Sequence, residues 1–592
     1  MSTSSNELKA YRLTIVVLLL IFPYAYIRFT TDSEVKSSVE VIRGTSPNEQ
    51  TDCKTTVCQQ QSTKLEAARK LEVAHEKERV VRAFVAELQE ATRLAAGGED
   101  ENAWYHKARW NRENPCLSRT EMPQMYARRK FVRDLDPNPQ WKAVLKQYAK
   151  LHRTCMHRIG DPTAYYLNRN TSINCKFAVI DTGKVGLGNR LLVFASVFAY
   201  SLLTKRVVLV AQSGTEVLES SWLCEPFEGS SWGHFDPARK ATPFHGENQY
   251  WNRSGSFLNR IDEARRLGNS SAALSLVEDY AVANDQQPDS RFFCDTEQEY
   301  YKNVTWVYFN SCFNFLPKFF TVPSFRPILD VLFPDRMVLT RILRDVMRPA
   351  DPAWIRVKNI NRGYLEHTNR HLGVHVRYDY RIGDYNSLHE TIAARVLQCA
   401  IANNILPPVQ ESTSDNKSAP APPLGRDPWD ISVFVASLYE GVKSNLTETF
   451  LRHPTATGDS VQVVQFSHEG NQKFGDDVYQ EALAEVLTLS LSDFLFVTPL
   501  STFSGIAQAY GGLVPWFIDF RPNITESGPC TRAQTVDVCF QVPFDYNIKC
   551  PYDPERHDKV ISDVYPEIQQ CLDVDTKGLQ VITENDLSMV QA

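Results

Sequence analysis

Hydrophobic positions divide the chain into an apolar N-terminal run, one long helix, and a region of short apolar strands alternating with helices. The N-terminal run extends from Leu13 to Ile27, and the helix is predicted over residues 63–96, before Gly97 and Gly98. Its apolar residues stand at irregular spacing among many Glu, Lys, Arg and Ala. This spacing favours a solvated or packed stem helix over a strict heptad coiled coil, while it still allows a homodimer.

From Trp141 onward the alternation of β-rich runs and helical segments is typical of parallel sheets covered by helices. We therefore expect an α/β fold with two Rossmann-like lobes, over residues 141–365 and 366–592. A helical link is expected at 323–362 and a Pro- and Ser-rich surface insertion at 407–428. The expected strands are 177–180, 206–210, 371–377, 431–438, 461–466, 494–497 and 514–520, and the expected helices 191–203 and 479–491.

The apolar run reads as a membrane-targeting segment. It is short for a full span of about 20 residues, and a cleavable signal peptide has a similar apolar core. No small-residue cleavage pattern follows Arg28, so we expect an uncleaved signal anchor. The resulting arrangement has a cytosolic tail at 1–12, a transmembrane segment at 13–28 and a stem at 29–140, with the rest in the lumen.

Composition agrees with a luminal location for most of the chain and excludes nucleic acid as a partner. The 592 residues exceed the size at which one hydrophobic core stops growing. A net charge of −6, from 64 basic and 70 acidic residues, offers no basic surface for nucleic acid. Thirteen cysteines without a CxxC pair indicate disulfides over zinc, and their odd number leaves one thiol free or intermolecular.

The first candidate site is a glycine loop between a strand and a helix, containing Gly186, Gly188, Asn189 and Arg190. Glycines let the backbone approach a ligand, and the first N–H groups of the helix can face a phosphate. The third glycine of a dinucleotide fingerprint is missing, so a tight structural turn is an equal alternative. The Asn-Arg pair at the helix start favours a site.

The second candidate is the strand His371 to Arg377. Period-two alternation places Leu372, Val374 and Val376 on an apolar face, and the candidate ligands His375 and Arg377 on a polar one. Ligands of open α/β sheets bind beyond the carboxyl ends of strands, where a guanidinium suits a diphosphate. The alternative is a solvated edge strand with a surface arginine. Zinc binding by the two histidines is disfavoured because no Glu-bearing helix accompanies them.

The third candidate follows the apolar strand at 494–497. Ser501, Thr502 and Phe503 stand at the start of a short helix, where hydroxyl and N–H groups can hold the same anion. An ordinary N-cap is the alternative. Three such loops at the carboxyl ends of strands together favour one ligand site.

These residues resemble the plant xyloglucan fucosyltransferase family. The resemblance runs in order over about residues 170–575. It rests on 186–210, Cys224-Glu-Pro-Phe, Phe292-Phe-Cys294, 372–377, Ala482-Leu-Ala-Glu485, Ser501-Thr-Phe503, Gly511-Gly512 and Pro515-Trp516. It implies an inverting GT-B-like enzyme with a donor cleft between its lobes. Such an enzyme moves L-fucose from GDP-β-L-fucose to a galactose of a cell-wall glycan, xyloglucan or arabinogalactan, in α1,2 linkage, and uses no metal or other cofactor.

The resemblance also implies residue roles and a location. Arg377 would hold the β-phosphate of the departing GDP, the 501–503 turn would line the diphosphate, and the glycine loop would face sugar and acceptor. Glu485 would bind guanine, since a carboxylate accepts from both N1–H and N2–H. Asp573 and Asp279 are the candidates for orienting or deprotonating the acceptor hydroxyl. The enzyme would be a single-pass type II protein of the Golgi membrane.

The chain departs from the family pattern at Leu500, where the family has Trp, and between Cys539 and Cys550. These departures leave the acceptor open. Two other function classes remain at this point. A metal-dependent GT-A transferase would use an Asp-x-Asp pair after a strand, but Asp134-Leu-Asp136 and Asp573-Val-Asp575 lack that context. A non-catalytic glycan-binding protein would lack affinity for GDP.

Overall fold

The computed structural model describes most of the chain after residue 55. The described residues are 56–97, 116–132, 134–167, 173–181, 185–210, 221–227, 273–277, 288–302, 304–311, 314–378, 385–410, 430–467, 475–499, 501–518, 528–538, 546–571 and 578–583. Within these ranges, no helix combines the length and apolar composition that a membrane span requires. The expected anchor at 13–28 and all but the first four residues of the insertion expected at 407–428 lie outside them. By contacts the chain divides into residues 1–76 and 77–592, a boundary that falls inside the long helix α2 (Thr56–Ala96).

The first sheet has four parallel strands in the order β2-β1-β4-β3. Buried apolar side chains fill β1 and β2, as expected for a sheet covered on both faces. Helix α5 beside it begins where the Asn138 side chain accepts from the Trp141 N–H, with Pro139 in the first turn, and ends at Gly160 with φ 67°. The elements are β1 (Phe177–Asp181), β2 (Val207–Val210), β3 (Ala273–Val277), β4 (Trp306–Asn310), α5 (Pro139–Ile159), α6 (Pro162–Leu167), α7 (Leu187–Leu203) and α9 (Asp295–Tyr301).

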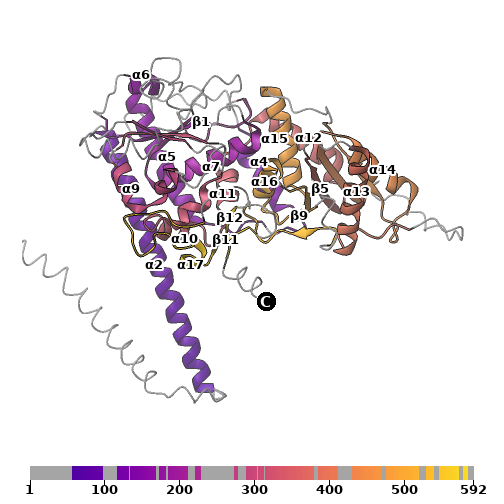
Figure 1. Cartoon of the computed structure of the whole chain (residues 1–592), viewed down its shortest axis with the longest axis horizontal. Helices are drawn as coiled ribbons and strands as arrows, with labels where there is room; N and C mark the ends of the chain where they lie inside the picture. The colour runs from indigo at the N-terminus through magenta and orange to yellow at the C-terminus, as the bar shows by residue number, and fades with distance from the viewer. Residues whose placement is uncertain are drawn as a thin grey trace, which may run out of the picture. The chain divides into compact units, whose positions relative to one another are not determined.

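The second sheet has the order β10-β9-β8-β5-β6-β7, parallel except for β10. Two layers of helices cover it, and in Figure 1 α15 and α16 lie on the opposite side of β5 from α13 and α14. The elements are β5 (Arg370–Val376), β6 (Ile431–Ser437), β7 (Val461–Val464), β8 (Phe494–Val497), β9 (Trp516–Phe517), β10 (Thr531–Arg532), α13 (Tyr385–Ala402), α14 (Gly441–Arg452), α15 (Asp476–Ser490) and α16 (Thr502–Gly511).

The order of the second sheet creates a topological switch point. The chain moves from β5 outward to β6 and β7 on one side, then returns to the other side of β5 as β8 and β9. Ligands of such sheets bind where the carboxyl ends of the two central strands diverge, here β5 and β8.

Short helices join and flank the two sheets. The expected helical link is present as three helices between β4 and β5, followed by a π-helical turn at Asn361–Leu365. The remaining elements are α4 (Ser118–Ala127), α10 (Arg326–Leu332), α11 (Val338–Asp345), α12 (Asp351–Ile360), α17 (Ile561–Val564), the 3-10 helices Pro288–Phe293 and Leu316–Thr321, and the hairpin β11 (Ile568–Gln570) and β12 (Leu579–Val581).

Four disulfides that join pairs of described cysteines support the expectation of an oxidising compartment. They join Cys116 to Cys224, Cys155 to Cys175, Cys294 to Cys550, and Cys399 to Cys530. The third of them connects segments 256 residues apart and ties the C-terminal part of the chain to the turn before α9.

One alternative and one expectation from the sequence need correction here. The alternative of a solvated edge strand at 371–377 is wrong, because β6 and β8 pair with β5 on its two sides. Of the strand expected at 514–520, the described residues 514–518 contain only the short β9, which pairs antiparallel with β10. The sequence also failed to predict β3 and β4.

Candidate functional site

Arg377 lies directly after β5, at the switch point of the second sheet. Its main-chain N–H donates to the Thr498 hydroxyl at 2.7 Å, and the same hydroxyl donates to the Arg377 carbonyl at 2.9 Å. The Thr498 N–H in turn donates to the His375 carbonyl at 3.0 Å. The backbone of Arg377 is thereby fixed between the ends of two parallel strands, while its side chain is exposed.

His375 of the second candidate packs against Phe503 of the third. Its ring stacks on Phe503 with centroids 5.1 Å apart and planes 18° apart. The imidazole is only 5% exposed, because α15 and α16 cover the face that the alternation marked as polar. Burial, with a further contribution from Arg377, lowers the pKa of His375 to about 3. The ring is therefore neutral near pH 7, and its Nδ1 atom has no hydrogen-bond partner.

The glycine loop meets the start of α16. Gly188 is the second residue of α7, and a Cβ at this position would lie 2.6 Å from the carbonyl carbon of Thr502. Beside this contact the Thr502 hydroxyl donates to Asn189 Oδ1 at 2.8 Å. Only glycine permits this approach. Two segments more than 300 residues apart in sequence thus form one surface, and both are the first turns of helices, α7 and α16.

Arg190 holds the glycine loop from beneath. It is 2% exposed, and its Nε donates to the Val185 carbonyl at 3.2 Å. Tyr479 of α15 donates to the same carbonyl at 2.9 Å, and the Arg190 guanidinium lies 5.4 Å from the Tyr479 ring centroid. These contacts give Arg190 a role in shaping the loop, and its expected contact with a ligand stays a prediction.

Glu485 occupies a different part of the second sheet. Its Oε1 atom accepts from the Ser467 hydroxyl at 2.5 Å, three residues past the end of β7, and the side chain is 9% exposed. Gln465 ties this segment to the end of β6 by donating to the Ser437 carbonyl at 2.9 Å. Glu485 therefore contacts the segment that follows the carboxyl end of the outer strand β7.

The arrangement suits a polyanion. The first N–H groups of a helix have no intrahelical partner, and the helix dipole adds about half a positive charge there. Two such helix starts are in contact at Gly188 and Thr502, at the end of the sheet where Arg377 lies. A phosphate chain placed there would meet backbone donors, hydroxyls and a guanidinium.

The acidic residues expected to act on the acceptor, or to hold a metal ion in the GT-A alternative, do not appear at this site among the described residues. Asp279 and Asp573 lie outside the described residues, so their roles stay predictions. Asp134, from the Asp-x-Asp pair of the GT-A alternative, pairs with Arg344 at 2.5 Å and therefore has a structural partner. Within the part of the chain that the structure describes, no cluster of three or more His, Cys, Asp and Glu side chains could hold a metal ion.

Sequence reasoning missed Thr498, Tyr479 and Gln465. A threonine after a strand and a tyrosine on a helix carry no motif, and their contacts depend on residues distant in sequence. The signal available for Thr498 was its place directly after the buried run 494–497, at a carboxyl strand end.

Comparison with known proteins adds the family. The sequence profile described as xyloglucan fucosyltransferase matches residues 108–549. A galactoside 2-alpha-L-fucosyltransferase of Pisum sativum is 30% identical, over 79% of this chain and 80% of its own length. The protein of the same name from Arabidopsis thaliana is 30% identical, over 79% and 81%. The solved structure of an Arabidopsis thaliana FUT1 mutant in complex with GDP superposes with a TM-score of 0.64 and 28% identity, over 80% of this chain and 98% of the other.

Proposed function

The chain belongs to the xyloglucan fucosyltransferase family, and on that premise we propose that it transfers L-fucose from GDP-β-L-fucose to a galactose residue of a glycan. The two relatives named galactoside 2-alpha-L-fucosyltransferase support galactose as acceptor and the 2-position as the linkage. The similar structure with bound GDP supports the nucleotide. The GT-B-like α/β fold, with its two parallel sheets, agrees with this assignment.

One observation carries the proposal: the starts of α7 and α16 meet at the switch point where Thr498 fixes Arg377. When the bond between fucose and the β-phosphate breaks, negative charge grows on the leaving diphosphate. Preorganised N–H donors and a guanidinium lower the free energy of that state without reorganising. This part of the site therefore acts on the leaving group.

The roles of the individual residues follow from their positions. Arg377 would bind the β-phosphate, while Ser501, Thr502 and Phe503 would line the diphosphate. Gly186, Gly188, Asn189 and Arg190 would form the wall toward sugar and acceptor. Neutral His375 would support Phe503 and offer a hydrogen bond, and Glu485 would hold guanine near the ends of the outer strands.

Inversion requires the acceptor hydroxyl to attack from the face opposite the leaving group and to lose a proton. Asp279 and Asp573 are our candidates for orienting the hydroxyl or accepting that proton. A carboxylate within hydrogen-bond reach of the hydroxyl would contribute a rate factor of about 100 to 10,000. Substituting each by Asn separates the two candidates.

We further infer that the enzyme needs no metal ion and resides in the Golgi membrane as a single-pass type II protein with its catalytic region in the lumen. The disulfides support an oxidising compartment. The domain limits at 29–140, 141–365 and 366–592, and a homodimer, stay predictions.

The direct experiment incubates the purified luminal portion with GDP-fucose and a panel of galactose-terminated cell-wall glycans, with and without EDTA. We expect EDTA-resistant release of GDP and a product with fucose on O2 of galactose, identified by NMR. Loss of activity in EDTA would favour the GT-A alternative. Absence of any stabilisation by GDP in thermal unfolding would favour a non-catalytic glycan-binding protein.

A further inference from the structure

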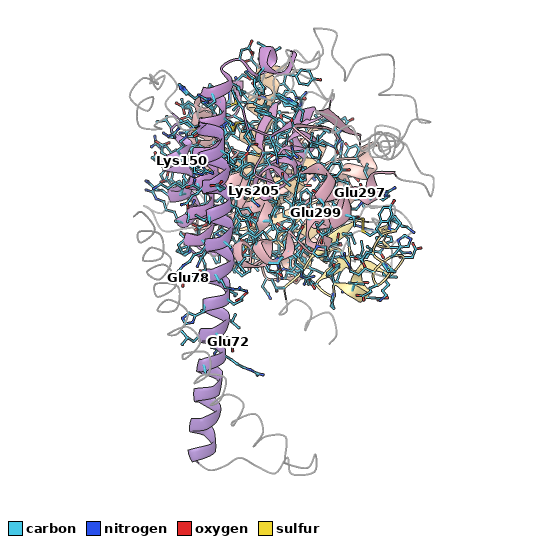
Figure 2. All side chains as sticks on the ribbon, turned by 90° about the vertical axis from the view of Figure 1, so that its left-hand side faces the viewer. Glu72, Glu78, Lys150, Lys205, Glu297 and Glu299 are labelled. Carbon is cyan, nitrogen blue, oxygen red and sulfur yellow. A yellow bond between two sulfur atoms is a disulfide. The ribbon has the colours of Figure 1, made fainter. Side chains whose placement is uncertain are left out.

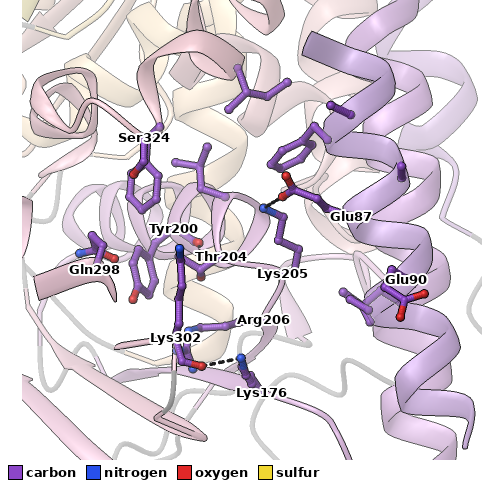
Figure 3. Close-up of a pocket in the computed structure, with 18 of the residues that line it drawn as sticks. Glu87, Glu90, Lys176, Tyr200, Thr204, Lys205, Arg206, Gln298, Lys302 and Ser324 are labelled. Atoms are coloured by element: carbon purple, nitrogen blue, oxygen red, sulfur yellow. Dashed lines mark hydrogen bonds and ion pairs between the residues drawn. The ribbon is translucent and has the colours of Figure 1, made fainter. Parts of the chain in front are cut away.

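A cavity lies between α2 and the first sheet, at the edge opposite the candidate site. It encloses about 910 Å³, within the range of about 300–1,000 Å³ that ligand pockets occupy. Figure 3 shows its walls: α2 on one side, and on the other the residues that precede β1, β2 and β4. Lys176, Arg206 and Lys302 come from these three segments.

The cavity has an excess of positive charge. Lys205 is neutralised by an ion pair with Glu87 of α2. Figure 2 shows Lys205 beside this helix. Glu90, the other carboxylate of this wall, is engaged by Arg93 at 2.5 and 2.7 Å. Lys302 is paired with Glu299, so among the described contacts Lys176 and Arg206 are the cations of the cavity wall that the structure gives no carboxylate partner.

Two of these cations bind main-chain carbonyls in place of carboxylates. Arg206, 1% exposed, donates to the carbonyls of Tyr301 at 2.5 Å and Val304 at 2.9 Å. Lys176 donates to the Lys302 carbonyl at 2.5 Å (Figure 3). Burial, followed by repulsion from Arg206, Lys302 and Lys205, lowers the pKa of Lys176. A ligand anion would relieve this repulsion.

The other walls of the cavity offer both apolar surface and a hydrogen-bond acceptor, a combination that suits the C–H faces and hydroxyl groups of a sugar. Phe325 and Ile328 supply apolar surface for C–H faces. Gln298, only 4% exposed, is one of the lining residues, and its buried Oε1 atom has no hydrogen-bond partner, so a small side-chain movement would let this acceptor meet a hydroxyl group. An acyl chain offers no donor to such a group.

We propose that this cavity binds a carboxylate-bearing saccharide, a uronic acid residue of a glycan, with its carboxylate against Lys176 and with the buried charge of Arg206 behind that lysine. The glycan nature of the ligand rests on the proposed function; the anionic character rests on the cavity alone. The cavity is a binding site apart from the transfer site, since it lies at the amino ends of β1, β2 and β4 and Arg377 lies at the carboxyl end of β5.

The test is calorimetric binding of trigalacturonate to the full chain in detergent, beside a neutral trisaccharide, inorganic phosphate and vesicles containing anionic phospholipid. Lys176→Gln removes the charge. Ala83→Trp fills space from the α2 side and leaves every charge in place. Lys443→Gln, which removes a lysine of α14 paired with Glu440, is the matched control.

We expect saturable binding of trigalacturonate that weakens about tenfold in Lys176→Gln, the loss of one charge-assisted hydrogen bond. The affinity for trigalacturonate also falls in Ala83→Trp and stays unchanged in Lys443→Gln. In the wild type it is higher than the affinity for the neutral trisaccharide or for phosphate. Equal affinity in Lys176→Gln overturns the proposal. The proposal is also overturned if phosphate binds as tightly as trigalacturonate does, or if vesicles bind in a Lys176-dependent manner while no saccharide binds.

GDP affinity, measured in parallel, separates this site from the proposed function. We expect it to be the same in the wild type and the three variants. Absence of GDP binding in all four proteins would count against the proposed function and not against this site.

Discussion

The hydroxyl of Thr498 is bonded to both main-chain groups of Arg377, accepting from its N–H at 2.7 Å and donating to its carbonyl at 2.9 Å. One side chain at the end of β8 thereby replaces the ladder hydrogen bonds that β5 would otherwise make after Val376. We infer that the position of Arg377, which is proposed to bind the phosphate, depends on this link, because it fixes both main-chain groups of the residue.

Replacing Thr498 by Val keeps its shape and removes both hydrogen bonds. We expect kcat/KM for GDP-fucose to fall about tenfold to a hundredfold, because each bond contributes about 0.5–1.5 kcal/mol and Arg377 loses its fixed backbone. Thr498→Ser restores the hydroxyl and should recover most of the activity. If Val and Ser variants lose activity equally, the hydroxyl is not what positions Arg377.

Gly188→Ala tests the contact between the two helix starts. An added Cβ would lie 2.6 Å from the main chain of Thr502, so α7 and α16 must separate. We expect a loss of turnover of at least about tenfold, since a displacement near 1 Å costs about a hundredfold in well-oriented sites. Gly363→Ala is the matched control, because nothing lies within 4 Å of a Cβ there. Full activity in Gly188→Ala would show that the helix starts need not touch.

Much of the second sheet was predictable because its strands are continuous apolar runs. Residues 431–437 and 494–497 are almost wholly buried, and their sequence shows it. The partner of each strand was not predictable, since β5 pairs with β8 across more than 100 residues of chain. That pairing alone brings Arg377 to Thr498.

The burial of His375 shows a second limit. Alternation correctly separated its face of β5 from the apolar face, but a polar residue on a strand gives no indication that helices from elsewhere cover it. Here α15 and α16 do so, and Phe503 stacks on the ring. The glycine loop was recognised for its glycines, and the reason for Gly188 emerged only from the approach of Thr502.

Asp537 makes folding stability depend on pH. Its Oδ1 atom is buried without a hydrogen-bond partner, and burial, followed by repulsion from Asp335, raises its pKa from 3.8 to about 8. The folded protein therefore holds a proton that the unfolded chain releases near pH 4. The contribution of this proton to the free energy of unfolding is complete below pH 3.8 and is lost as the pH rises through about 8.

We therefore expect Asp537→Asn to unfold at a higher temperature than the wild type at pH 7.5, with the difference shrinking toward pH 4.5. Differential scanning calorimetry across this range measures it. Asp477→Asn, at an exposed position in the first turn of α15, should show no such trend. A difference that does not change with pH would mean that Asp537 is ionised in the folded protein.

The central claim is that Arg377, held at the switch point, binds the diphosphate of GDP. Calorimetric titration of GDP into the wild type and Arg377→Ala tests it most directly. Loss of a charge-assisted hydrogen bond to phosphate should weaken GDP binding about tenfold or more, with the unfolding temperature of the ligand-free protein unchanged. Equal GDP affinity in the two proteins would contradict the account.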